Sequence, residues 1–528
     1  MKVEPASLAY KPLRASGISV AHAVRLFNAE LDILDGREAR RPYLAEALPE
    51  VNTDSWKVFP DGRMETTYRL RPNITWHDGA PLTASDFVFG WRVYATPELG
   101  TSSLRPASFM EDVQAPDPRT LVIRWRALYP DAGGLYDGAF PPLPRHILEN
   151  AYENDSAEAF TANRYWDAEF VGAGPYRLER WEPGALIEGT AFEGHVLGRP
   201  KIDRVIIRFM PDENTVLSNL LAGSVDFASD RTIRFEQANV LKNDWGPRNG
   251  GTVILSPVQP RFADAQLRPE YANPSSIMDL RVRQALAHAI DRQSVNEGLY
   301  NGTNVASDIP ITSRAPYFAE LDRTFTHYAN DGRRTDQLMS EAGFTKGNDG
   351  FFVNSTGERF TPGYLQEIGG QTERETALVT GSWRSAGFDF QITALAASQL
   401  RDTQARSTFP SIHLTAMAPA FRYGEKNLEQ FTTAQVGSPA NRWRGNNYGG
   451  WSNADYDRLW ESYNGTLDRS ERDRQVIQMV KLLSDQLPYF LVHWNYNVSA
   501  HSSALRGPDS EAVDTLVNWN IYEWEMVS

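Results

Sequence analysis

The side chains best suited to binding a ligand gather between residues 409 and 451. Three arginines lie in this segment, Arg422, Arg442 and Arg444. A guanidinium group can bind a carboxylate or phosphate through two parallel hydrogen bonds. Because the chain carries a net charge of −14, three arginines in one segment favour an anionic or zwitterionic ligand.

Aromatic residues alternate with these arginines among turn-forming residues. Their flat faces can stack on a ligand, and Trp and Tyr add a polar group, although core packing and loop anchoring are the commoner uses of such side chains. Asn446 and Asn447 could hydrogen-bond a ligand amide, but their default role beside Gly449-Gly450 is turn formation. We predict as ligand-binding residues His413, Met417, Arg422, Tyr423, Trp443, Arg444, Asn447, Tyr448 and Trp451.

The sequence contains no recognisable catalytic, nucleotide-binding or metal-binding motif. It lacks a Gly-x-Ser-x-Gly elbow, a P-loop, a His-Glu-x-x-His helix and a complete Gly-x-Gly-x-x-Gly loop. Gly172-x-Gly174 begins like a nucleotide loop, but Pro175 and Arg177 break the pattern and indicate a tight turn. The histidines never recur at i, i+2 or i, i+4, and there is no cysteine. We therefore predict no catalytic residue, no metal ligand and no cofactor.

Counting carboxylates does not exclude an acid–base pair of the glycosidase kind, since Asp and Glu together number 67. Three conspicuous aspartates nevertheless suit structural roles. Asp78 fits a turn before Gly79, Asp86 fits the first turn of a helix, and Asp203 lies in a predicted strand. A glycosidase- or peptidase-like enzyme stays an alternative that no motif supports.

Length and composition are typical of a globular protein of several domains. The 528 residues are too many for one core, so two or three domains are expected. Acidic residues outnumber basic ones by 67 to 53, which argues against a nucleic-acid partner. The sequence contains no run of about 18 apolar residues, the length needed to span a membrane. Residues 1–5 do not form a signal peptide. The absence of cysteine is compatible with an oxidising compartment.

Periodicity predicts the elements that position these residues. Asp61-Gly62 is typical of a two-residue hairpin turn with positive φ at both positions, and residues 64–71 alternate as a half-buried strand. Thr83 and Asp86 fit a capping box at the start of a helix. One face of that helix carries Phe87, Trp91 and Tyr94.

The pattern continues through the middle of the chain. Residues 201–209 predict a strand, Asp212 starts a helix that stops at Gly223, and another strand begins at Val225. Residues 279–292 predict an amphipathic helix. Its apolar face comprises Val282, Ala285, Leu286, Ala289 and Ile290.

Four segments in order resemble one family. Residues 70–87, which include Trp76-His77-Asp78-Gly79-Ala80-Pro81, resemble the signature of extracytoplasmic solute-binding proteins of family 5, the peptide, nickel and opine receptors of ABC importers. Further resemblance lies at residues 279–292, 338–344 and 447–457, so it covers about residues 44 to 457.

The resemblance implies an α/β chain with the two-lobed periplasmic-binding-protein type II fold and an extra subdomain inserted in the first lobe. We place lobe I at 1–257 and 498–528, with the subdomain at about 42–165. Lobe II is expected at 262–493. The two crossings, which would act as hinges, are expected at about 258–261 and 494–497.

The resemblance also implies a non-catalytic receptor. It would deliver a small polar ligand to an ABC importer permease by hinge closure of two lobes. An oligopeptide is the leading ligand, with an opine, an amino-acid conjugate or an oligosaccharide as alternatives; the histidine pattern disfavours nickel. From another class, a chaperone-like or signalling module stays open. We expect a monomer in the periplasm or at the extracytoplasmic membrane surface, its export signal removed; whether it is a lipoprotein is left open.

One departure from the family bears on the ligand. In peptide-binding members an aspartate after the strand corresponding to residues 411–418 holds the α-ammonium group of the ligand. Pro419 stands there in this chain and offers neither charge nor N–H. The next acid is Glu425, which could substitute for it. The departure weakens the peptide hypothesis and leaves the receptor hypothesis intact.

Overall fold

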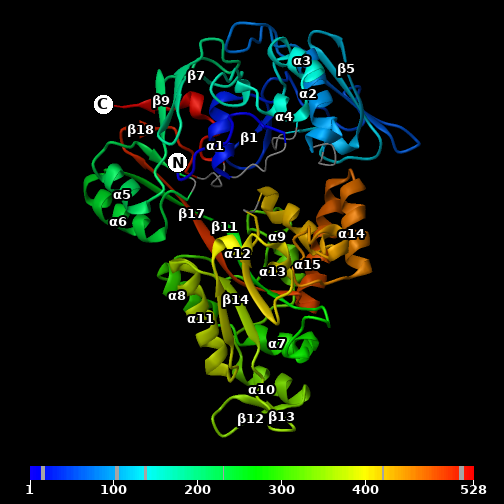
Figure 1. The fold of residues 1–528 in the computed structure, drawn as a ribbon, viewed down its shortest axis with the longest axis vertical. Coiled ribbons are helices and arrows are strands. Elements are labelled where there is room, and N and C mark those ends of the chain that lie inside the picture. The colour runs from blue at the N-terminus through cyan, green and yellow to red at the C-terminus, as the bar shows by residue number, and fades with distance from the viewer. Residues whose placement is uncertain are drawn as a thin grey trace. The chain divides into compact units, whose positions relative to one another are not determined.

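The chain folds into two compact units. The computed structural model describes residues 1–12, 18–100, 106–135, 140–229, 231–418, 421–510 and 516–527. The first unit comprises Met1–Ser256 and Asn497–Ser528, and the second comprises Pro257–Tyr496. Two neighbouring strands, β11 (Gly251–Ala265) and β17 (Tyr489–Ser502), each run from one unit into the other (Figure 1). The inserted subdomain and the hinge role of the crossings stay predictions.

The first unit contains two larger antiparallel sheets, ordered β3-β4-β6-β5 and β7-β8-β9, and several helices. Its main elements are α1 (Ile18–Phe27), β1 (Asp32–Leu34), β2 (Arg40–Pro42), β3 (Trp56–Val58), β4 (Met64–Arg69), α2 (Ala84–Ala95), β5 (Met110–Asp117), β6 (Thr120–Trp125), α3 (Arg145–Asn154), α4 (Ala157–Thr161), β7 (Tyr176–Glu182), β8 (Leu186–Ala191), β9 (Arg204–Arg208), α5 (Glu213–Leu221), β10 (Phe227–Ala228), α6 (Phe235–Trp245), β18 (Leu505–Arg506) and β19 (Glu525–Met526).

The predicted hairpin forms, but its turn differs from the prediction. β3 and β4 pair antiparallel, and the burial of β4 alternates as its sequence indicates. Of the two turn residues only Gly62 has positive φ, at 83°. The loop is longer because Phe59 N donates to Arg63 O (2.9 Å) and the Asp61 carboxylate accepts from Arg63 N (3.1 Å). The prediction of a two-residue turn was therefore wrong.

The helix-start predictions of this unit are confirmed. Asp86 accepts a hydrogen bond from Thr83 N (2.8 Å) at the start of α2, and its other oxygen accepts from Arg145 N (3.1 Å). Asp212 caps α5 by accepting from Thr215 N (2.7 Å). Asp78 accepts from Ala80 N (3.0 Å) in its turn.

His77 explains the Gly172-x-Gly174 sequence. Its Nδ1 accepts from Gly172 N (3.2 Å), so its Nε2 carries the proton donated to Gly174 O (3.0 Å). A Cβ on either glycine would collide with backbone atoms of Phe27 or Asn28. The tight turn predicted for this loop is thus required by close packing against the end of α1.

In the second unit helices flank a sheet whose strand order is β17-β11-β16-β14-β15; β10 of the first unit pairs with the far end of β17. Its elements are α7 (Leu280–His288), α8 (Arg292–Tyr300), α9 (Phe318–Thr324), α10 (Gly332–Glu341), β12 (Phe344–Lys346), β13 (Phe352–Asn354), β14 (Gly363–Glu367), α11 (Gly370–Ala386), β15 (Gln391–Leu395), α12 (Ala397–Leu400), α13 (Thr403–Ser407), β16 (Ile412–Ala416), α14 (Ala454–Gly465) and α15 (Arg469–Gln486).

The amphipathic helix predicted at residues 279–292 is shorter than expected. α7 begins where predicted, with Asp279 accepting from Arg281 N (2.9 Å), but it ends at His288. Asp291 then caps α8 by accepting from Ser294 N (2.9 Å). A second cap inside the predicted span ends the helix early, because a capping residue has non-helical dihedral angles. Among the described residues, no helix is long and apolar enough to cross a membrane.

Candidate functional site

The segment after β16 is irregular, with backbone angles that few side chains adopt. It contains short 3₁₀ turns within Phe421–Phe431, which non-helical angles at residues 422–424 interrupt, and at Thr433–Gln435 and Pro439–Asn441. Two pairs of non-glycine residues have positive φ: Arg422 and Tyr423 (50° and 61°), and Arg442 and Trp443 (57° and 59°). Positive φ costs free energy in such residues and persists where surrounding contacts impose it, often in binding segments.

Asn447 ties this segment together. Its Nδ2 donates to Thr432 O (3.1 Å) and Trp451 O (2.8 Å), while its Oδ1 accepts from Gly450 N (3.1 Å) and Trp451 N (3.2 Å). The whole amide is occupied by the backbone around it. The structure therefore gives Asn447 a bracing role in the loop.

Two more predicted residues lie in the core of the second unit. Met417 and Trp451 are 2% and 5% exposed and pack in one hydrophobic cluster with Phe262 and Tyr489. The Trp451 indole donates to Gln486 Oε1 (3.0 Å). Their burial places both beneath the loop surface.

Trp443 lies at the surface with a cationic neighbour. The Arg268 guanidinium is 4.9 Å from the Tyr271 ring centroid and 5.9 Å from that of Trp443. Arg268 also donates to Gly437 O and Tyr448 O, both at 2.9 Å. Trp443 is half-buried and Arg444 is exposed, so this part of the loop presents an aromatic face and a cation.

His413 and Tyr448 are brought together. Their ring centroids are 5.8 Å apart, Phe409 lies 5.4 Å from His413, and the Arg406 guanidinium stands 4.8 Å above the Tyr448 ring. Burial, followed by the charges of Arg406 and Arg261, lowers the pKa of His413 to about 3. His413 is therefore a neutral imidazole at physiological pH.

Asp264 is a polar residue of this region that the sequence did not single out. It lies opposite His413 in the β11–β16 ladder and is 5% exposed. Burial raises its pKa well above the usual value. Asp264 Oδ2 and His413 Nδ1 have no hydrogen-bond partner among the described residues. Its sequence signal is an acid within the otherwise apolar stretch 262–265.

Glu425 is not available as a substitute for the missing aspartate. Its carboxylate, which is 0% exposed, accepts from Tyr317 Oη (2.8 Å) and Tyr463 Oη (2.7 Å) and pairs with Arg469 (2.5 Å). Burial tends to raise its pKa, but Arg469, the charge of Arg422 and the Tyr463 hydrogen bond together lower it. Pro419 lies outside the described residues.

A buried charged cluster joins the two crossing strands in the second unit. Glu375 on α11 accepts two hydrogen bonds from Arg261 of β11 on Oε2, from Nη2 at 2.5 Å and from Nε at 3.1 Å. Its Oε1 accepts from His493 Nε2 of β17 at 3.1 Å. Gln371 Nε2 donates to the second oxygen as well (3.0 Å). Burial would raise the pKa of Glu375, but Arg261 and His493 bring it down to about 2.

In the described ranges no three His, Cys, Asp or Glu side chains converge as a metal-binding group would require. The histidines instead contact carboxylates, carbonyl groups and aromatic rings. The arrangement offers hydrogen bonds, a cation and aromatic faces to a ligand.

Sequence comparison identifies a family. The sequence model described as "Bacterial extracellular solute-binding proteins, family 5 Middle" matches residues 46–438. The oligopeptide-binding protein AppA of Bacillus subtilis is 22% identical over 488 residues, which are 91% of this chain and 82% of AppA. Heme-binding protein A of Haemophilus influenzae is 22% identical over 505 residues, 92% of this chain and 85% of that protein.

Structural comparison agrees on the fold. The crystal structure of NikZ from Campylobacter jejuni in complex with Ni(L-His) matches with a TM-score of 0.74 and 21% identity. The match covers 99% of this chain and 98% of NikZ. The chain therefore shares its fold with proteins of different named ligands.

Proposed function

Because this chain belongs to family 5 of the bacterial extracellular solute-binding proteins, we propose that it captures an oligopeptide and delivers it to the permease of an ABC importer. The observation that carries the proposal is the family match over residues 46–438, supported by the likeness to AppA. Relatives named for heme and structures named for nickel keep the ligand class open. Action as a monomer, in the periplasm or at the membrane surface, belongs to the same proposal.

Ligand contact is assigned to the predicted residues that keep solvent-accessible surface. These are Arg422, Tyr423, Trp443 and Arg444, which are half-buried or exposed. Met417, Asn447 and Trp451 support them from below, and His413 with Tyr448 forms the neighbouring buried cluster. Arg422, Tyr423 and Trp443 of this set have positive φ, which fits a segment shaped by ligand binding.

Charge in this segment favours recognition of a carboxylate over recognition of an amine. Arg444 is an exposed guanidinium, whereas Glu425 is closed off by Arg469 and two tyrosines. Pro419 cannot bind an ammonium group through charge. The peptide is thus held by its carboxylate and its backbone, with the amino terminus contributing little.

Matched peptides test this proposal. An N-acetylated pentapeptide should bind within about threefold of the free peptide, while C-terminal amidation should weaken binding about tenfold or more, a loss of roughly 1.4 kcal/mol. Isothermal titration gives both constants, and Arg444→Gln should remove the effect of amidation. A tenfold loss on acetylation would contradict the assignment.

The ligand class can be tested without choosing a peptide. Native mass spectrometry of the purified protein, before and after mild denaturation and refolding, should show bound masses spaced by amino-acid residues. One discrete mass that is not a peptide would instead support an opine, conjugate or sugar ligand. Small-angle scattering should show a smaller radius of gyration on ligand addition if β11 and β17 act as hinges; an unchanged radius at saturation would contradict the hinge role.

A further inference from the structure

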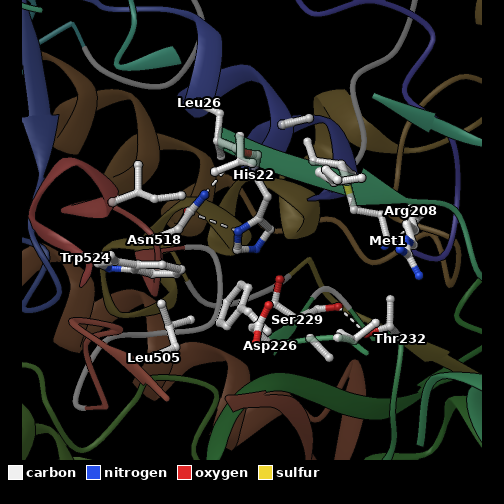
Figure 2. A pocket seen from close by; sticks show the side chains of 18 of the residues that line it. Met1, His22, Leu26, Arg208, Asp226, Ser229, Thr232, Leu505, Asn518 and Trp524 are labelled. Carbon is white, nitrogen blue, oxygen red and sulfur yellow. Dashed lines mark hydrogen bonds between the residues drawn. The ribbon is translucent and has the colours of Figure 1, made fainter. Parts of the chain in front are cut away.

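A pocket of about 430 Å³ lies wholly within the first unit (Figure 2). This His22 pocket takes its name from the imidazole that points into it from α1. Its other walls come from α5, the C-terminal segment 505–526 and the edges of β9 and β10, each the last strand of its sheet. The amino group of Met1 donates to Arg208 O on the edge of β9 (2.6 Å). None of the predicted ligand-binding residues lines the pocket.

His22 leaves one polar atom of this pocket without a partner. Asn518 Nδ2 donates to His22 O (3.2 Å), which turns its Oδ1 toward His22 Nδ1 (3.1 Å). Nδ1 must then carry the proton, which leaves Nε2 as an acceptor, and among the described residues Nε2 has no partner. A single acceptor among mostly apolar side chains does not identify an occupant. Glu425 of the second unit is the opposite case, since both of its carboxylate oxygens have partners.

A left-handed turn of three residues comes directly before Glu425. Arg422, Tyr423 and Gly424 have φ of 50°, 61° and 97°. Glycine adopts such angles readily, but in the other two residues they cost free energy and persist only where surrounding contacts impose them. Arg422 and Tyr423 are both assigned to the ligand. The contacts that hold this turn therefore also direct two ligand-binding side chains.

Glu425 is fixed to three other elements of the second unit. Tyr317, just before α9, donates through its hydroxyl to Oε1 (2.8 Å), and Tyr463 on α14 donates to Oε2 (2.7 Å). Arg469 on α15 spans both oxygens, at 2.5 Å and 3.4 Å. The carboxylate is 0% exposed. Because these three elements hold the side chain of Glu425, they also fix where the turn ends.

The backbone on either side of Glu425 is held as well. Tyr423 O accepts from Thr312 N (3.0 Å), and the Tyr423 ring packs against the hydrophobic cluster of the second unit. Beyond Glu425, Leu428 is 1% exposed and its carbonyl accepts from Tyr456 Oη (2.7 Å). The middle of the turn is thus bonded to Thr312, its end is anchored by Glu425, and the chain then enters the core.

We propose that Glu425 is a positioning residue for ligand binding, which holds the left-handed turn in the shape that directs Arg422 and Tyr423 to the ligand. This rests on the proposed function, which supplies the two ligand contacts. The hydroxyl groups of Tyr317 and Tyr463 orient the side chain at position 425, and Arg469 balances its charge. A neutral side chain of the same shape therefore suffices for positioning once the balancing cation is removed with it.

Two double variants separate positioning from stability. Both carry Arg469→Met, because a guanidinium left without its carboxylate would destabilise the fold by itself. Glu425→Gln/Arg469→Met keeps an amide that can hydrogen-bond both tyrosines, whereas Glu425→Ala/Arg469→Met keeps no such group. Isothermal titration uses acetyl-Ala-Ala-Ala-Ala-Ala with a free C-terminal carboxylate. The Gln variant should bind it within about threefold of the parent, and the Ala variant about tenfold or more weaker.

Hydrogen exchange of the Thr312 amide reports the turn without any ligand, because this amide donates to Tyr423 O. Exchange should be about tenfold faster or more in the Glu425→Ala double variant and close to the parent rate in the Glu425→Gln double variant. Arg283→Met is the control for stability alone. Arg283 is buried in the same unit and donates to Gln486 O (3.0 Å), so its loss should lower the urea midpoint and leave the Kd unchanged.

The two readouts distinguish this proposal from the proposed function. Equal Kd values for the two double variants, or unchanged Thr312 exchange in the Glu425→Ala double variant, would overturn the positioning role. A weaker Kd in Arg283→Met would overturn it too, since loss of stability alone would then weaken binding. If the parent protein binds no peptide, the proposed function fails, and the exchange rates still decide whether Glu425 shapes the turn.

Discussion

Glu375 and His22 are both buried and ionisable, but their surroundings differ. The two carboxylate oxygens of Glu375 accept hydrogen bonds from Arg261, His493 and Gln371. His22 has one partnered nitrogen and one without a partner among the described residues. Complete pairing marks a group that holds structure, because nothing is left for a ligand. A buried polar atom left over calls for an occupant.

The two groups are similarly buried, but they differ in how completely their polar atoms are hydrogen-bonded. The Glu375 cluster ties α11 to the two strands that cross between the units. The His22 pocket instead exposes strand edges and apolar side chains. Substitutions at the two places should accordingly have opposite consequences.

The largest effect is expected from Glu375→Ala. It leaves the buried Arg261 without its carboxylate, and removing one partner of a buried ion pair costs about 3–5 kcal/mol. Chemical unfolding measures the loss. Glu373→Ala, at an exposed position two residues earlier on α11, is the matched control and should change stability by less than about 0.5 kcal/mol. A loss below about 1 kcal/mol at Glu375 would remove the contrast with His22.

Lowering the pH should reduce the stability of the folded chain through His22, which is buried as a neutral imidazole. Burial first, then Arg25 and the N-terminal ammonium, lower the pKa of His22 to about 3, although the hydrogen bond that the ring donates to Asn518 Oδ1 opposes them. The unfolded chain binds a proton near pH 6.5 and the folded chain does not, so stability falls as pH drops below about 6.5. Asp226, Arg204 and Arg208 also line the pocket.

His22→Phe should therefore gain stability relative to the parent protein as pH falls. The relative gain between pH 8 and pH 5 is roughly 2 kcal/mol, since each pH unit below 6.5 adds about 1.4 kcal/mol. Urea unfolding at both pH values gives the difference, and the pH 8 measurement is the internal control. A constant difference between pH 8 and pH 5 would show that His22 does not titrate as its surroundings require.

Local sequence patterns correctly predicted helix caps, strands and helix starts, which depend on residues close together in the chain. The caps at Asp86 and Asp212, the alternating strand before residue 70 and the start of α7 follow from spacing alone. The turn at Asp61 and the end of α7 were wrong because side-chain caps that compete with the pattern decided them.

The candidate site was harder to predict because its contacts join distant segments. Trp451 was predicted to bind ligand from among turn residues and Met417 from the strand and loop at 411–419, yet long-range packing buries both. Glu375 sits in a helix rich in charge, and nothing local distinguishes it from the exposed Glu373. The edge of β9 is invisible in sequence, since its pairing with Met1 depends on residues two hundred positions apart.

The smallest effect is expected from adding methyl groups at one position that lines the pocket and at one position in the packed sheet. Ala228 of β10 lines the pocket, whereas Ala263 of β11 is fully buried in the packed sheet. Adding two methyl groups by Ala263→Val forces neighbours apart and should cost about 1–3 kcal/mol. Ala228→Val should stay within about 0.5 kcal/mol of the parent, because its added atoms enter the pocket. Both changes put the same β-branched residue into a strand, so intrinsic strand preference cancels in the comparison. Equal costs in urea unfolding would mean that the pocket wall is as tightly packed as the sheet.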